Sequence, residues 1–232
     1  MAFLAAWTGT ILVDASARLA DRNRDPFILA VGVLMADAKT IAIYDSKAAD
    51  YAASFTSNTP DKTLQAFMDL LPKGARVLDL GCGPGTASAH MRDAGLDPDP
   101  MDASQGMIAL ARERYDLPVR LGTFDDISGN AIYDGIWANF SLLHAARTDL
   151  PRYLKALATA TKPDGIIHVG MKTGDGTKRD AMDRLYTFVT VPELRGLLED
   201  TGFAVTHIKE GAERGMAGTI DPFVIMQGRK NA

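Results

Sequence analysis

Apolar and polar positions follow two alternating patterns along residues 41–232. Residues 61–71 place apolar side chains at their fourth, seventh, eighth and eleventh positions, which is the spacing of an amphipathic helix. Further helices are predicted after Gly85 as far as residue 92, after Ser104 as far as residue 114, and at 150–161 and 190–202. The apolar runs between them predict strands at 76–80, 97–102, 119–122, 132–139, 165–171, 203–209 and 223–227. Strands that alternate with helices of about 10–15 residues indicate an α/β fold with a doubly wound, mainly parallel sheet.

The strand at 97–102 contains two prolines, Pro98 and Pro100. Residues two apart in a strand direct their backbone amides to the same side, so both missing N–H donors face one neighbour. An interior strand would lose two ladder hydrogen bonds in this way. We therefore expect this strand to be short, paired well on one side only, or displaced at its start.

Residues 1–40 do not share this alternation and are predicted to form an N-terminal extension to a domain at 41–232. Two apolar runs, 1–13 and 27–36, flank a charged stretch. Three interpretations remain open. The extension is a helical hairpin packed on the domain, a secretory signal that lacks the usual basic start, or translated upstream sequence with the natural start at Met35.

Composition narrows the class of protein. Of the 232 residues, 47% are hydrophobic and 23% are charged, which is ordinary globular usage. The formal net charge of −4 lacks the positive excess typical of nucleic-acid binders, and no apolar stretch reaches the roughly 18 residues of a membrane span. A single cysteine excludes an internal disulfide and any multi-cysteine metal site. We expect a cytoplasmic protein that acts without nucleic acid, membrane or metal.

The most informative segment is VLDLGCGPG, which begins at Val77. Glycines directly after a strand and before a helix allow a sharp turn and let a ligand touch the backbone. Asp79 lies two residues before the first glycine, where a carboxylate would repel a pyrophosphate but attract an ammonium group. Asp102, at the next strand end, can accept hydrogen bonds from ribose hydroxyls. The pattern favours a ligand with a ribose and a positive charge and without phosphates.

This loop, the strand end MDAS at 101–104, the segment DGIWANFSLLH at 134–144 and KPDG at 162–165 together resemble the class I S-adenosylmethionine-dependent methyltransferases. The resemblance covers about residues 41–228 and is greatest to the small-molecule group of trans-aconitate methyltransferase-like and tellurite-resistance-type enzymes. It implies a Rossmann-like, seven-stranded sheet with one antiparallel strand near the C-terminus. It also implies S-adenosylmethionine as the cofactor and S-adenosylhomocysteine as the product.

The resemblance assigns cofactor contacts to the glycine loop, the second strand end, the segment after the third strand and the fourth strand tip: Asp79, Gly81, Cys82, Gly83, Asp102, Ala103, Met107, Phe124, Asp125 and Asn139. The loop would hold the methionine moiety, the second strand end the ribose, and the residues after it the adenine. Asn139 would face the methyl group and its acceptor. Core packing is the alternative role for Met107 and Phe124, and Asp126 is the alternative to Asp125.

The acceptor is predicted to be a small molecule. The fourth strand tip reads ANFS rather than the Asn-Pro-Pro-aromatic run of enzymes that methylate base amines, and no cysteine nucleophile follows it. His144 is the candidate catalytic base for a hydroxyl or thiol acceptor, with a loop hydrogen bond as its alternative role. A carboxylate acceptor is already ionised at neutral pH and needs no base.

The sequence MKTGDGTKRD follows the fifth strand, at the edge of the sheet where such folds bind ligands. Lys172 and Arg179 are candidates to hold an anionic acceptor, with Tyr186 beside them, and a solvated loop is the alternative. Tyr44 and Tyr51, expected ahead of the first helix, are candidates to cover the cofactor, with packing as the alternative.

The sequence thus predicts a monomeric or homodimeric enzyme that moves the methyl group of S-adenosylmethionine to an oxygen, sulfur or carboxylate of a small metabolite, an anionic one being favoured. Two other functions remain as alternatives. One is a non-catalytic partner subunit that binds the cofactor. The other is a nicotinamide-dependent oxidoreductase, which Asp79 and the glycine spacing disfavour.

Overall fold

The computed structural model describes residues 36–55 and 57–232. The interpretations of residues 1–35, including a start at Met35, lie outside these residues. The first described helix, α1 (Ala38–Phe55), runs across the boundary expected at residue 40. Among the described helices, none is long and apolar enough to cross a membrane.

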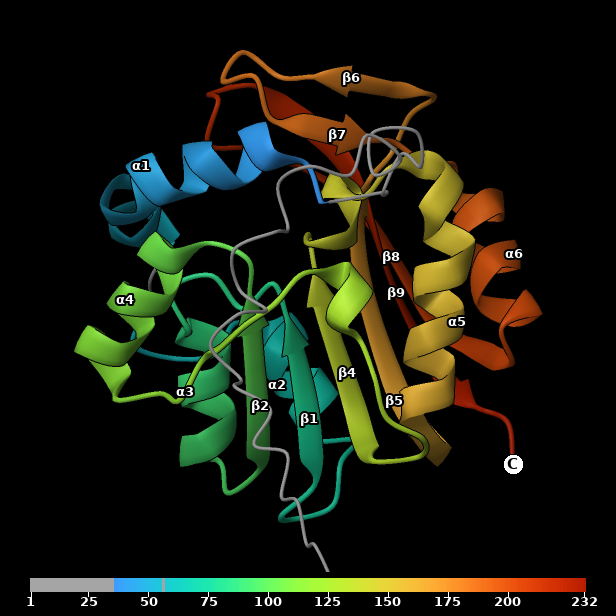
Figure 1. Cartoon of the computed structure of the whole chain (residues 1–232). Helices are drawn as coiled ribbons and strands as arrows, with labels where there is room; N and C mark the ends of the chain where they lie inside the picture. The colour runs from blue at the N-terminus through green and yellow to red at the C-terminus, as the bar shows by residue number, and fades with distance from the viewer. Residues whose placement is uncertain (1–35, 56) are drawn as a thin grey trace, which may run out of the picture. The chain divides into compact units, whose positions relative to one another are not determined.

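A seven-stranded sheet forms the centre of the molecule (Figure 1). Its strands in spatial order are β3 (Arg120–Leu121), β2 (Asp97–Asp102), β1 (Arg76–Leu80), β4 (Tyr133–Asn139), β5 (Thr161–Lys172), β9 (Ile220–Lys230) and β8 (Phe203–Arg214). Neighbouring strands are parallel except at β9, which is antiparallel to both β5 and β8. The predicted α/β class, with seven strands and one antiparallel strand near the C-terminus, is confirmed.

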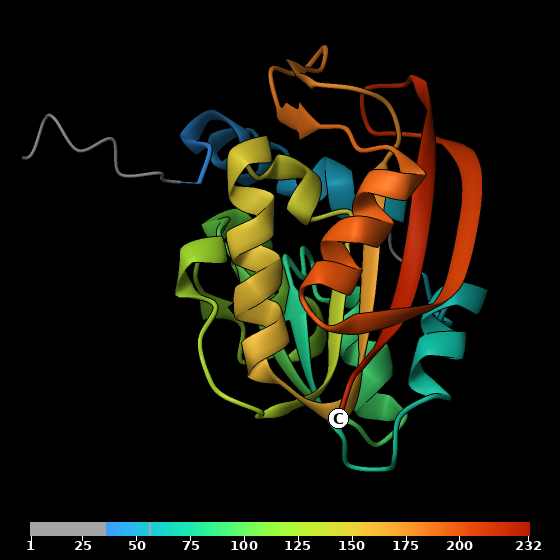
Figure 2. The ribbon, with the colours of Figure 1, turned by 90° about the vertical axis from the view of Figure 1, so that its right-hand side faces the viewer.

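Helices cover both faces of this sheet. The pair α5 (Leu150–Ala160) and α6 (Val191–Asp200) lies side by side on one face, and α2 (Lys62–Met68) lies on the other (Figures 1 and 2). The remaining helices are α3 (Thr86–Asp93) and α4 (Gln105–Tyr115). They follow β1 and β2, as the alternation of strands and helices predicts.

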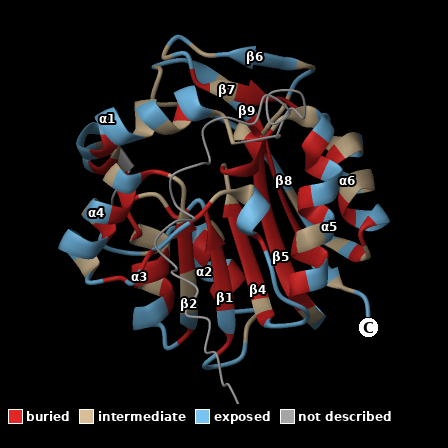
Figure 3. Cartoon of the chain, viewed as in Figure 1, coloured by how far each residue is buried: buried red, intermediate tan, exposed pale blue. Residues whose placement is uncertain are grey.

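Side chains alternate between the two faces of each strand, so a hydrophobic core lies on each face of the sheet. Leu78 and Ile136 pack in the cluster that includes α5 and α6, while Val77 and Trp137, one residue away, pack in the cluster with α2. Successive strand side chains point to opposite faces, so a strand covered on both sides is apolar throughout. Figure 3 shows the result, with buried strands between helices that expose their outer surfaces.

Capping side chains fix where two of the helices begin. The Ser104 hydroxyl accepts a hydrogen bond from the Met107 backbone N–H at 3.1 Å and so caps α4. Thr190 and Glu193 form a reciprocal capping box at the start of α6. Such side chains satisfy backbone donors that have no partner within the first helical turn. Both starts agree with the predicted ones.

The two prolines of β2 are accommodated as expected. The strand pairs with β1 over five positions, from Asp97 to Met101, but with β3 only at Met101 and Asp102. One-sided pairing is the arrangement in which the missing donors of Pro98 and Pro100 remove no ladder hydrogen bond.

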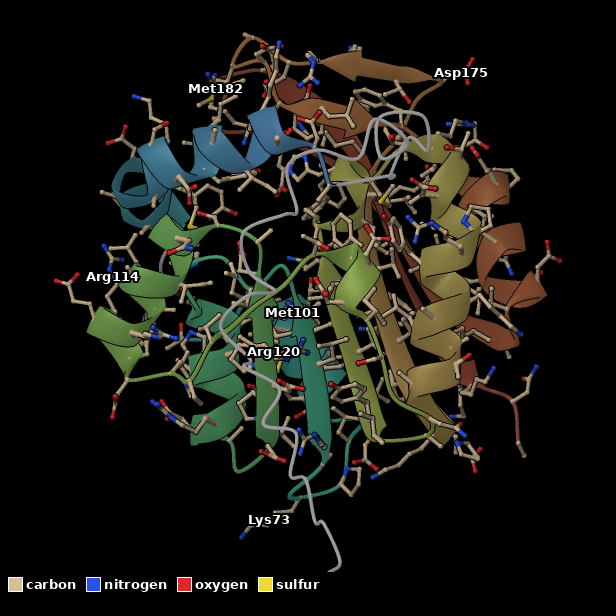
Figure 4. The ribbon with its side chains drawn as sticks, viewed as in Figure 1. Lys73, Met101, Arg114, Arg120, Asp175 and Met182 are labelled. Atoms are coloured by element: carbon tan, nitrogen blue, oxygen red, sulfur yellow. The ribbon has the colours of Figure 1, made fainter. Side chains whose placement is uncertain are left out.

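Two features were not predicted. Helix α1, which contains Tyr44 and Tyr51 and precedes the first predicted helix, is one of them. The segment after β5 is not an open loop, because β6 (Thr177–Arg179) and β7 (Leu185–Thr187) pair as an antiparallel hairpin. Figure 4 labels Asp175 and Met182 beside this hairpin, at the carboxyl ends of the central strands, and Lys73 at the opposite edge.

Candidate cofactor and acceptor site

Two adjoining cavities lie at the carboxyl ends of the central strands. The smaller, of about 110 Å³, is lined by Asp102, Met107 and their neighbours. The larger, of about 550 Å³, extends to the end of β5 and the β6–β7 hairpin. The residues that line both cavities include Tyr44, Gly81, Gly83, Asn139 and His144. The cavities therefore meet between the glycine loop, the tip of β4 and helix α1.

The glycine loop is held in a left-handed backbone conformation against β2. Gly81 and Gly83 have φ values of 70° and 55°, which glycine adopts without strain. The Gly81 N–H donates to the Met101 carbonyl at 2.8 Å. A Cβ atom at Gly81 would lie 2.6 Å from Ser141 Cβ, so this position has no room for a side chain. The loop thus presents bare backbone to both cavities.

Asp79 is a buried carboxylate without a counter-ion. Its side chain is 2% exposed, lines the larger cavity and accepts a hydrogen bond from the Ser88 hydroxyl at 2.7 Å. Burial raises the pKa of Asp79 to about 7, the Ser88 bond lowers it, and the nearby Asp102 charge raises it further. Among the described residues, no basic side chain forms an ion pair with it. A ligand ammonium group would supply the missing charge.

Asp102 connects the glycine loop to the second strand. Its two carboxylate oxygens accept hydrogen bonds from the Gly83 N–H at 2.7 Å and the Ser104 N–H at 2.8 Å. Burial raises the pKa of Asp102, and these backbone hydrogen bonds oppose that effect. Each oxygen keeps a further lone pair, so the carboxylate can still accept ligand hydroxyl donors.

The smaller cavity contains most of the residues expected around adenine. Ala103, Met107 and Phe124 line it, and the Phe124 ring also packs on Tyr153 with centroids 5.3 Å apart. Met107 and Phe124 therefore combine a packing role with a place at the cavity wall. Cys82 lines the larger cavity, and burial keeps the pKa of its thiol well above the ordinary value.

Asp125, which was expected to contact adenine, lies outside both cavities. Asp125 is exposed, and its carboxylate accepts a hydrogen bond from Arg152 Nη1 at 2.5 Å. The alternative, Asp126, turns back to accept from the N–H and hydroxyl of Thr123. Both carboxylates are thus engaged by local partners outside the cavities.

His144 lies at the junction of the cavities, with both ring nitrogens engaged. Nδ1 is 2.7 Å from the Leu185 carbonyl, and Nε2 is 2.8 Å from the Tyr44 hydroxyl. Burial lowers the pKa of His144 to about 4, so the ring is neutral at physiological pH. Because a carbonyl only accepts, Nδ1 carries the proton and Nε2 accepts from Tyr44.

Helix α1 covers the junction and is attached to the domain by side-chain contacts along its length. Asp45 accepts hydrogen bonds from the Ser104 hydroxyl at 2.6 Å and the Gly106 N–H at 3.0 Å. Near the start of the helix, Asp37 forms an ion pair with Arg179 at 2.7 Å. These attachments hold Tyr44 over the glycine loop.

Arg179, which was expected to hold the acceptor, lies outside the larger cavity. Its guanidinium binds Asp37 and the Asp183 carbonyl. Arg184 occupies that wall instead. It is 2% exposed, and its Nη1 donates to the Tyr44 hydroxyl at 3.0 Å while Nε and Nη2 bind Asp180.

Lys172 and Tyr186 lie where the sequence placed them, on the wall of the larger cavity. Lys172 forms an ion pair with Asp221 of β9, and its Nζ lies 4.3 Å from the centroid of the Tyr186 ring. No pattern in the sequence indicated that β9 would place Asp221 beside Lys172. Asp180 and Arg184 are four residues apart, and this spacing was the pattern in the sequence that could have indicated a role for Arg184.

The larger cavity has a mixed but unequal set of charges. Among the described residues, its lining includes five basic side chains, Lys62, Lys172, Arg184, Lys209 and Arg214, and four acidic ones, Asp61, Asp79, Glu213 and Asp221. No cluster of three or more metal-ligating side chains occurs among the described residues.

Comparison with known proteins gives a family match over most of the domain. A family profile described as "Methyltransferase domain" matches residues 52–208. Malonyl-[acyl-carrier protein] O-methyltransferase of Pectobacterium atrosepticum is 32% identical over 107 residues, which cover 44% of this chain and 42% of that protein. Trans-aconitate 2-methyltransferase of Delftia acidovorans is 35% identical over 111 residues, covering 44% and 39%. The chain thus matches less than half the length of these relatives.

A solved structure shares the fold over most of this chain. The Burkholderia thailandensis 1,6-didemethyltoxoflavin-N1-methyltransferase, determined with its substrate and S-adenosylhomocysteine, superposes with a TM-score of 0.65. The superposition covers 84% of this chain and 88% of that one, at 24% sequence identity. The arrangement of the sheet and its helices is therefore shared, while the side chains are largely different.

Proposed function

Because the chain belongs to the class I S-adenosylmethionine-dependent methyltransferases, we propose that it transfers a methyl group from S-adenosylmethionine to a small anionic metabolite. One observation carries the proposal. The carboxylate of Asp79, buried without a counter-ion among the described residues, lines the same cavity as Arg184 and Lys172. A cationic cofactor and an anionic acceptor fit these side chains.

The residues at the junction fit the cofactor. Asp79 would accept hydrogen bonds from its ammonium group and Asp102 from its ribose hydroxyls, while Gly81 and Gly83 let it approach the backbone. When bound, S-adenosylmethionine supplies an electrophilic methyl group on a positively charged sulfur. The chain's own contribution is to orient this group toward the acceptor and to exclude water, because positioning provides much of the rate in such a transfer.

The acceptor would lie between Arg184, Lys172 and Tyr186. Lys172 and Arg184 are each paired with one carboxylate, Asp221 and Asp180, and their N–H groups supply the donors that would bind an anion. Two relatives matched over part of the chain are, by name, a malonyl-[acyl-carrier protein] O-methyltransferase and a trans-aconitate 2-methyltransferase. Both names contain a carboxylic acid, which agrees with an acidic acceptor here.

His144 would act by holding Tyr44 rather than as a free base. Its Nε2 already accepts the Tyr44 proton, and its lowered pKa of about 4 makes it a weak proton acceptor. An acceptor that is ionised before binding needs no base. The site therefore suits a carboxylate or another ionised oxygen or sulfur.

The proposal is tested by titration calorimetry followed by an acceptor screen. We expect S-adenosylhomocysteine to bind and NAD to leave no signal. We then expect release of S-adenosylhomocysteine from S-adenosylmethionine when small di- and tricarboxylic acids are added, but not when their uncharged amides are added. Binding without turnover on any acid would favour the alternative of a non-catalytic cofactor-binding subunit. Binding of NAD alone would refute the proposal.

A further inference from the structure

The buried His168 is hydrogen bonded to Asn139, a partly buried residue that lines both cavities. His168 lies in β5 with no exposed surface, and its Nε2 is 3.0 Å from Asn139 Oδ1 at the tip of β4. The imidazole stacks on Trp137 with ring centroids 3.8 Å apart. A histidine in the apolar layer between sheet and helix is costly to bury, so its single hydrogen bond calls for an explanation.

The tautomer of His168 follows from its surroundings. Burial, with a smaller effect of His207, lowers the pKa of His168 to about 3, so the ring is neutral and carries one proton. An amide oxygen only accepts hydrogen bonds, so the contact to Asn139 Oδ1 requires the proton on Nε2. Nδ1, which has no hydrogen-bond partner among the described residues, is then a bare lone pair. The opposite tautomer would bury an unpaired N–H donor at Nδ1. It would also place the lone pair of Nε2 against the lone pairs of Asn139 Oδ1.

The same contact also describes the orientation of the Asn139 amide. Oδ1 is directed to His168 and lies over Gly170, where a Cβ atom would be only 2.8 Å away. The Asn139 nitrogen forms no hydrogen bond within the described residues and is not a buried atom. Asn139 lines both cavities, so its two N–H donors are available where they meet.

We propose that His168 is a positioning residue that turns the amide donors of Asn139 toward the methyl acceptor, which favours an anionic oxygen or sulfur over an amine nitrogen. An attacking amine carries N–H bonds of its own that need acceptors, so amide donors oppose it. An ionised oxygen has lone pairs for the donors and one more for the new bond. The inference rests on the proposed function and narrows its acceptor class.

The methyl transfer to an ionised acceptor needs no base. A bond forms between the acceptor oxygen and the methyl carbon as the carbon–sulfur bond breaks, and the electron pair of that bond remains on sulfur. No proton leaves an ionised acceptor. The task of Asn139 is therefore to hold the oxygen in line with the breaking bond.

The first test reads the tautomer and needs no acceptor. In the full chain with ¹⁵N-labelled histidine, the ring nitrogens of the four histidines give separate signals, and the His168→Gln variant assigns those of His168. We expect a protonated Nε2 and an unprotonated Nδ1. A proton on Nδ1 would overturn the orientation of Asn139, whatever reaction the protein catalyses.

The second test measures selectivity with two variants. His168→Leu removes the donor, whereas His168→Gln keeps an amide N–H near the position of Nε2. With a carboxylate acceptor and an amine of the same skeleton, we expect His168→Leu to lower the carboxylate-to-amine ratio of kcat/KM about tenfold, the effect of one oriented hydrogen bond. S-adenosylhomocysteine affinity should stay unchanged, and His168→Gln should restore the ratio.

Three results would count against the inference. Equal losses on both acceptors would show a general structural role for His168, and failure of His168→Gln to restore the ratio would remove the hydrogen bond as the cause. Wild-type preference for the amine would refute the acceptor class directly. A wild-type chain that methylates neither acceptor would contradict the proposed function instead, and the tautomer measurement would then still decide the orientation of Asn139.

Discussion

Replacing Asp79 with asparagine should stabilise the cofactor-free protein at neutral pH and weaken its affinity for S-adenosylmethionine. The carboxylate is 2% exposed and has no cationic partner among the described residues, and burial raises its pKa from 3.8 to about 7. At 1.36 kcal/mol per pH unit, this difference corresponds to about 4 kcal/mol. Asparagine keeps the oxygen that accepts from Ser88 and removes the buried charge.

The direction of the pH dependence follows from proton uptake. Between pH 3.8 and about 7, Asp79 is ionised in the unfolded chain and protonated in the folded one. Its stabilising contribution is therefore fully present below pH 3.8 and is lost as the pH rises to 7. The Asp79→Asn variant lacks this slope, so its stability relative to the wild type should grow by up to about 4 kcal/mol over that interval and then level off.

Urea unfolding of the cofactor-free chain, followed by circular dichroism at steps from pH 4 to pH 8, measures this difference. Asp164→Asn is the matched control, because Asp164 is an exposed carboxyl at a left-handed turn position that asparagine also tolerates. Saturating S-adenosylhomocysteine should flatten the wild-type curve. Parallel curves for wild type and Asp79→Asn would refute the reasoning.

Two further predictions concern the ligands. Asp102→Ala should lower the affinity for S-adenosylhomocysteine by about 10- to 100-fold in calorimetry, the effect of losing charge-assisted hydrogen bonds to the ribose, and an unchanged affinity would contradict that role. Combined Lys172→Gln and Arg184→Gln changes should spare cofactor binding and abolish transfer, whereas Arg179→Gln should retain turnover. Loss of transfer in Arg179→Gln alone would place that residue back among the acceptor contacts.

The sheet could be predicted because each of its strands is marked locally. Strand β1 is a short apolar run that ends in glycines, and α4 and α6 begin at capping residues that the sequence shows directly. Even the one-sided pairing of β2 followed from its prolines. These features depend on the nearest residues along the chain, and a single sequence is sufficient for them.

The acceptor wall could not be predicted in the same way. Arg179 and Arg184 are five residues apart in one basic segment, and only the β6–β7 pairing decides which guanidinium enters the cavity. The Asp125 carboxylate binds Arg152, which lies 27 residues away on another element. Contacts of this kind are set by tertiary packing, which leaves no periodic pattern in the sequence.

The two halves of the site come from separate stretches of the chain. Loops and strand tips between Asp79 and Asn139 supply the cofactor side, whereas the wall opposite is built by Lys172, the β6–β7 hairpin and the antiparallel β8–β9 pair. Under the proposed function, the molecule that is modified could therefore vary without a change in how the methyl donor is held. For an engineer, the same division makes residues 172–223 the region to randomise when a new acceptor is wanted.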